Sequence, residues 1–70
     1  MPFCSFPEWQ YEFERQLRAR THKDFYSLYP PPSDYNVMKK ELYLAYSRDE
    51  SPSGMVERVI NDLGLIDYTV

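Results

Sequence analysis

The sequence is poor in the residues that build catalytic and metal centres. Its 70 residues include one cysteine, one histidine and two glycines. Cys4 has no second cysteine with which to form an intramolecular disulfide, and a structural zinc site needs more ligands than Cys4 and His22 provide. A catalytic role for His22 would need a nucleophile and a carboxylate beside it in a deep pocket, for which a chain of this size has little room. We therefore expect a protein that is not an enzyme, with no catalytic residue, metal or cofactor.

Long apolar segments and an excess of positive charge are also absent. No apolar run approaches the ~20 residues of a membrane-spanning helix, and the first residues lack the basic and apolar regions of a signal peptide. The formal net charge of −3 does not favour nucleic-acid binding, because that affinity comes mainly from neutralising phosphates with Lys and Arg. A single cysteine fits a reducing compartment. We expect a cytoplasmic protein that binds neither a membrane nor nucleic acid.

Aromatic residues are abundant instead. Seven tyrosines, four phenylalanines and one tryptophan make up 17% of the chain. Aromatic side chains bury large areas and anchor both protein cores and protein interfaces. A domain of this length has a marginal core, so we expect dense aromatic packing, or association with another chain, to supply extra stability.

Apolar spacing and proline positions predict a single all-α domain of three helices around an aromatic core. The predicted helices span about 6–22, 34–47 and 53–63. Apolar residues recur every three or four positions, which places them on one face of a helix. These residues are Phe6, Trp9, Phe13 and Leu17 in the first helix, where the spacing then stops, and Val56, Val59, Ile60 and Leu63 in the third.

The segments between the predicted helices contain capping residues and prolines. The predicted N-terminal caps are Ser5, then Ser33 or Asp34, then Ser51 or Ser53, and Gly64 is the predicted C-terminal cap of the third helix. The segment 24–29 is expected to be an irregular turn or an extended piece over the core. Prolines 30–32 form a stiff connector between the first two helices. The short tail, 65–70, is predicted to be extended and to dock on the domain itself.

The second predicted helix is apolar on more than one side. Its main apolar face contains Tyr35, Met38, Leu42, Ala45 and Tyr46. Val37 and Leu44 fall on roughly the opposite side, with Tyr43 between the two sides. A helix with apolar residues on two sides needs cover on two sides. We therefore expect it to be either the central helix of the domain or one face of an oligomer.

Aromatic, aliphatic and arginine residues outside the predicted core are candidate contacts for a partner protein. Tyr11 points away from the apolar face of the first helix, and an exposed tyrosine beside arginines is a common binding anchor. The basic run 15–23 is either a patch for an acidic partner or phosphates, or a solvated helix face paired with nearby glutamates. The predicted partner-binding residues are Tyr11, Arg15, Arg18, Tyr26, Tyr29, Tyr43 and Leu44.

These features favour a small non-enzymatic protein-binding module. It would occupy a surface of a larger protein, basic or mixed in charge, and modulate or inhibit that protein. In size and composition the chain is similar to many inhibitors encoded by phages or mobile elements, although no motif points to one family.

Two other functions are compatible with the sequence. The first is a homodimeric structural or assembly subunit whose self-interface contains Val37, Tyr43 and Leu44. The second is a helix-turn-helix-like DNA-binding regulator built from the last two predicted helices. The acidic residues Glu57 and Asp62 on the last helix disfavour the DNA-binding alternative, because they would face phosphates.

Overall fold

A computed structural model describes residues 5–69, and every regular element in this range is a helix. Helix α1 spans Phe6–Thr21, α2 spans Phe25–Leu28, α3 spans Ser33–Ser47 and α4 spans Pro52–Leu63. The all-α prediction is confirmed, and the three predicted helices begin and end within one residue of their expected positions. We expected the segment 24–29 to be an irregular turn or an extended piece. This expectation is wrong, because the segment contains α2.

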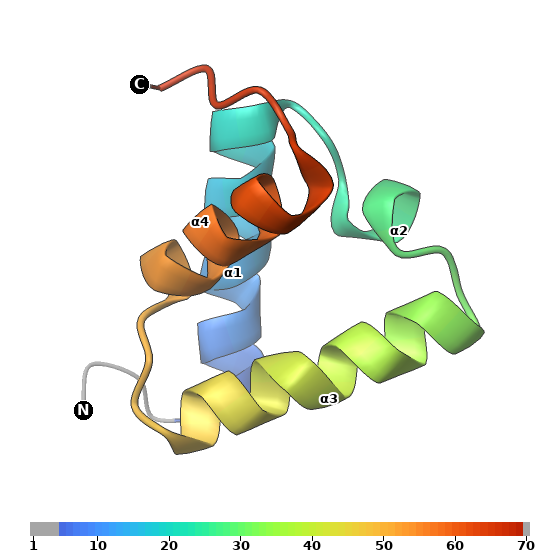
Figure 1. The fold of residues 1–70 in the computed structure, drawn as a ribbon. Coiled ribbons are helices and arrows are strands. Elements are labelled where there is room, and N and C mark those ends of the chain that lie inside the picture. The colour runs from blue at the N-terminus through green and yellow to red at the C-terminus, as the bar shows by residue number, and fades with distance from the viewer. Residues whose placement is uncertain (1–4, 70) are drawn as a thin grey trace.

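Helix α1 is the centre of the fold. It packs against α4 most extensively and also against α3 and α2. In Figure 1, α1 runs through the middle of the molecule, α4 crosses it, and α3 lies along the lower edge. Of the two alternatives predicted for the helix over 34–47, the central helix is therefore wrong, and one face of an oligomer stays a prediction. The Cα positions span 29 × 29 × 16 Å, so the fold is flat. The side of α3 opposite its buried residues is exposed to solvent.

The core is aromatic at its centre and aliphatic on the α4 side. Phe13 is fully buried, with its ring stacked on Trp9 at a centroid distance of 6.0 Å and edge-on to Phe25 at 5.7 Å. Both geometries are favourable for aromatic pairs. The buried apolar residues are Trp9, Phe13 and Leu17 from α1, Phe25 from α2, Met38, Leu42 and Ala45 from α3, and Met55, Val56, Val59 and Ile60 from α4. The aromatic core expected from the sequence is therefore present.

Two polar groups extend this core. The Trp9 indole N–H donates to the backbone carbonyl of Glu50 at 2.8 Å, which ties the α3–α4 loop to α1. Thr21 is buried, and its hydroxyl donates to the Leu17 carbonyl at 2.7 Å. The buried face of α1 therefore continues to Thr21 rather than stopping at Leu17, because the hydroxyl is satisfied within the helix.

Helix α2 is too short to be stable by its own backbone hydrogen bonds. The Asp24 carboxylate accepts from the Phe25 N–H at 3.1 Å at its start. The Phe25 ring then fills the core beside Phe13. Phe25 also lies 5.2 Å from the Tyr35 ring of α3, and Leu28 packs against the core. These tertiary contacts supply the stability that so short a helix lacks by itself.

The ends of α4 follow the sequence prediction. The Ser51 hydroxyl accepts from the Gly54 N–H at 3.0 Å, so Ser51 rather than Ser53 is the N-terminal cap. Gly64 ends the helix with a φ of 64°, a left-handed conformation that glycine adopts at little cost.

The starts of α1 and α3 differ from the prediction. Ser5 precedes α1 but its side chain makes no capping hydrogen bond. Pro32 precedes α3, so Ser33 and Asp34 lie inside its first turn and neither is the cap. The Asp34 carboxylate is nevertheless favourable there, because the helix dipole is positive at this end.

The C-terminal tail docks on the domain, as predicted for its described part. The backbone N–H of Tyr68 donates to the Arg20 carbonyl at 2.7 Å, at the end of α1. The Arg20 guanidinium also forms an ion pair with Asp67, and this pair lowers the pKa of the Asp67 carboxyl to about 2. The tail therefore covers the last turn of α1.

Candidate functional site

The predicted partner-binding residues fall on three separate surfaces. Tyr11, Arg15 and Arg18 lie on the outer side of α1. Tyr26 and Tyr29 lie on and just after α2, and Tyr43 and Leu44 lie on α3. They do not form one site.

The outer side of α1 forms a shallow hollow of about 230 Å³ that includes all three predicted α1 residues. Tyr11 is 70% exposed. The arginines beside it are already paired. Arg15 donates through Nε to Glu12 at 2.9 Å, and Arg18 lies 3.5 Å from the Asp24 carboxylate. The pKa of Glu12 is lowered to about 2 by its hydrogen bonds from Arg15 and Gln16. These pairs support the interpretation of the basic run as a solvated face.

The two tyrosines near α2 make contacts within the domain. The Tyr26 ring stacks on Tyr35 with centroids 5.0 Å apart and planes inclined by 7°. Its hydrogen bond with Tyr35 raises the pKa of Tyr26. The Tyr29 ring lies 5.6 Å from Phe25, and partial burial raises the pKa of Tyr29. Both rings therefore contribute to packing around α2.

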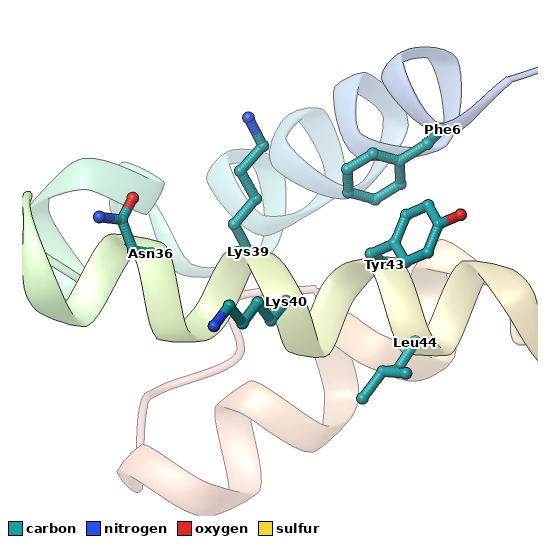
Figure 2. Close-up of a pocket in the computed structure, with 6 residues that line it drawn as sticks. All are labelled: Phe6, Asn36, Lys39, Lys40, Tyr43 and Leu44. Carbon is teal, nitrogen blue, oxygen red and sulfur yellow. The ribbon is translucent and has the colours of Figure 1, made fainter.

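A groove of about 700 Å³ lies between the start of α1 and one side of α3. We call it the α1–α3 groove, and its lining residues are Phe6, Asn36, Lys39, Lys40, Tyr43 and Leu44. The Phe6 ring meets Tyr43 edge-on at a centroid distance of 5.3 Å, which forms an aromatic end to the groove. Tyr43 is 54% exposed and Leu44 is 43% exposed. Figure 2 shows Lys39 and Lys40 one helical turn before these two residues.

The lining of the groove is positive although the chain is acidic overall. It contains Lys39 and Lys40 and no carboxylate. The Lys39 ammonium lies 5.8 Å from the centroid of the Tyr35 ring, within cation–π range. Lys40 has no ion pair within 4.0 Å among residues 5–69. The groove thus offers apolar surface beside two ammonium groups, which suits a ligand with apolar and acidic side chains.

Sequence reasoning found Tyr43 and Leu44 but missed the rest of the groove. Phe6 was assigned to the core, yet it is only partly buried because α1 begins there. No binding role was predicted for Lys39 or Lys40. The sequence signal that could have identified the two lysines is their spacing. Lys39 and Lys40 lie four residues, about one helical turn, before Tyr43 and Leu44.

Other parts of the described chain offer no competing chemical site. No group of three or more His, Cys, Asp and Glu side chains within residues 5–69 is placed to hold a metal ion. His22 caps α1, and its ring lies 4.4 Å from the Tyr68 ring. Arg58, the single arginine of α4, donates to Glu50 at 2.7 Å. Cys4 lies outside the described residues.

No helix in residues 5–69 has the length and hydropathy needed to cross a membrane. The chain matches no known protein family, no curated protein sequence and no solved structure. Function is therefore inferred from the chemistry of the α1–α3 groove.

Proposed function

We propose that this protein is a non-enzymatic protein-binding module that holds a segment of a larger protein in the α1–α3 groove. The observation that carries the proposal is the exposed apolar surface of Tyr43 and Leu44, beside the partly buried Phe6 and two lysines. A 70-residue domain has little apolar surface to spare from its core. Large aromatic and aliphatic side chains left exposed together mark interaction surfaces.

The lining suits a protein segment better than a small molecule. Small-molecule sites are concave and hold a few fixed polar groups that orient the ligand. Here the polar groups of the groove are exposed lysines and Asn36, on flexible side chains along an open helix surface. Such a surface fits a partner helix or loop that inserts apolar side chains beside Tyr43 and places carboxylates near Lys39 and Lys40.

The groove also refines the expected partner. The sequence favoured a partner of basic or mixed surface, because the chain has a net charge of −3. The two lysines favour a mixed surface with an acidic and apolar segment at the point of contact. Occupation of that segment would modulate or inhibit the larger protein by excluding its other ligands.

Site-specific photo-crosslinking in the source organism tests the proposal. One variant carries a benzoylphenylalanine in place of Tyr43. The matched control carries it in place of Glu57, which is exposed on α4 outside the groove. We expect one protein to crosslink at position 43 and not at position 57. The purified partner should then bind the wild-type chain and bind Tyr43→Ala at least about tenfold more weakly.

Two results would contradict the proposal. The first is equal crosslinking of the same protein from positions 43 and 57. The second is an unchanged Kd for Tyr43→Ala when circular dichroism shows that the variant is folded.

A further inference from the structure

The fold contains a further hollow that is separate from the α1–α3 groove. It has a volume of about 330 Å³ and lies where α2, the first half of α3 and the end of α4 meet. Figure 1 shows the first turn of α3 close to α2. We call this site the α2–α4 hollow, and its lining residues are Leu28, Tyr29, Asp34, Val37, Met38 and Leu63. None of the six lines the α1–α3 groove.

Apolar side chains make up most of this lining. Met38 is buried, and Leu28 and Tyr29 are partly buried against the core. Val37 is 64% exposed and Leu63 is 45% exposed, although both are aliphatic. Exposed aliphatic side chains gathered around a concave surface mark an interaction site. The volume is at the lower end of the about 300–1,000 Å³ of ligand pockets, so the hollow suits one or two apolar side chains of a partner segment.

The charged groups around the hollow are carboxylates. Asp34 lines it, and no Lys or Arg does. Glu41 follows Asp34 by seven residues, which places both on the same flank of α3. Asp62 of α4 lies close enough to Tyr29 that burial and the charge of Asp62 both raise the pKa of Tyr29. The hollow is therefore negative, whereas the α1–α3 groove is positive.

These carboxylates are not neutralised by the described part of the chain. Asp34, Glu41 and Asp62 have no ion pair within 4.0 Å in residues 5–69. Asp62 lies in the last turn of α4, which contains no basic residue. The helix dipole is negative at this end, so a carboxylate there is unfavourable. A cation supplied by another molecule would relieve this repulsion.

We propose that the α2–α4 hollow binds a basic segment of another protein, in which one or two large apolar side chains are flanked by arginine or lysine. The apolar side chains would lie beside Val37 and Leu63, and the cations beside Asp34 and Asp62. Charge complementarity selects this occupant over an acidic segment, which the carboxylates would repel. Arginine suits the site better than lysine, because its guanidinium pairs with carboxylates through two hydrogen bonds and stacks on rings such as Tyr29.

This docking surface goes beyond the proposed function. The α1–α3 groove takes an acidic and apolar segment, whereas the α2–α4 hollow takes a basic and apolar one. Helix α3 contributes to both sites, so the chain would hold two segments of opposite charge at once. Because the two sites share no lining residue, the loss of binding at one leaves binding at the other measurable.

NMR titration of the isotopically labelled chain with a defined peptide tests the proposal. The probe is acetyl-Lys-Arg-Phe-Leu-Arg-Lys-amide. Glutamine replaces every Lys and Arg in one control peptide, and serine replaces Phe and Leu in the other. We expect the basic peptide to shift the amide resonances of Leu28, Val37 and Leu63 with a Kd of about 1 mM or below. Each control peptide should bind at least about fivefold more weakly, because it lacks either the charges or the apolar side chains.

The double variant Asp34→Asn/Asp62→Asn tests the carboxylates. It should weaken binding of the basic peptide at least about fivefold. The matched control is Asp49→Asn/Glu57→Gln, which removes the same net charge from exposed residues outside the hollow. We expect the control to change the Kd less than about twofold, because charges distant from the peptide are screened by salt. The NMR spectrum of each variant also shows whether it is folded.

Any of three results would overturn the proposal. The first is the absence of shifts at the hollow up to about 10 mM basic peptide. The second is equal affinity for the glutamine peptide, or equal weakening by the two double variants. The third is a set of shifts confined to the α1–α3 groove. Photo-crosslinking from position 43 tests the proposed function separately and does not depend on these results.

Discussion

Truncation of Phe13 to alanine tests the aromatic centre of the core. Phe13 is fully buried and contacts the rings of Trp9 and Phe25. A buried Phe→Ala change costs about 3–5 kcal/mol, since it removes apolar contacts and leaves a cavity. The total stability of a 70-residue domain is about 3.5–10 kcal/mol, from ~0.05–0.15 kcal/mol per residue. The variant should therefore be largely unfolded or close to it at room temperature.

Urea unfolding followed by far-UV circular dichroism measures this loss. Tyr11→Ala is the matched control, because Tyr11 lies on the same helix but is mostly exposed. We expect the control to change the free energy of unfolding by less than about 0.5 kcal/mol. A loss below about 1 kcal/mol for Phe13→Ala would refute the packing described for α1. An equal loss for Tyr11→Ala would refute the assignment of its buried and exposed faces.

Three further predictions concern the loop, the tail and the end of α4. Trp9→Phe leaves the Glu50 carbonyl without the indole donor. The free energy of unfolding should fall by about 1 kcal/mol beyond the effect of lost packing, and an unchanged urea midpoint would contradict this. The Asp67 carboxyl has a pKa of about 2 in the folded chain because of Arg20, so its stabilisation is present above about pH 4 and is lost as the pH falls toward about 2. Asp67→Asn should therefore flatten the acid limb of stability against pH, and an unchanged limb would show that the pair contributes nothing. Gly64→Ala forces a Cβ into a left-handed conformation and should lower stability by about 1 kcal/mol in urea unfolding, whereas a neutral result would argue against the glycine cap.

Local sequence patterns predicted the features of the fold that depend on local chemistry. The apolar spacing of Trp9, Phe13 and Leu17 gave the buried side of α1, since that spacing is a property of the helix itself. Ser51 or Ser53 was the predicted N-terminal cap of α4 and Gly64 its predicted C-terminal cap; Ser51 and Gly64 are the caps in the structure. Caps are predictable in this way because they act on neighbouring backbone groups. The two-sided apolar character of 34–47 predicted either a central helix or one face of an oligomer; α3 is not central, and its second apolar side, with Val37, Tyr43 and Leu44, is exposed.

Features that depend on tertiary contacts were missed. Helix α2 depends on tertiary contacts such as that of Phe25 with Phe13, and nothing in its four residues shows those contacts. The α1–α3 groove was also missed, since Phe6 and Tyr43 are far apart in the chain and meet only after folding. The pairing of Arg18 with Asp24 depends on the turn at His22, whose left-handed conformation the sequence did not reveal.

The central claim is that exposed apolar residues of α3 serve binding and not the stability of the domain. The most direct test measures the thermal stability and the partner affinity of Leu44→Ser. Leu42→Ser, on the buried side of α3, is the matched comparison. We expect Leu44→Ser to lower Tm by less than about 5 °C while raising the Kd for the crosslinked partner at least about tenfold. Leu42→Ser should unfold the chain. A Leu44→Ser variant that binds normally, or one that unfolds as Leu42→Ser does, would contradict the claim.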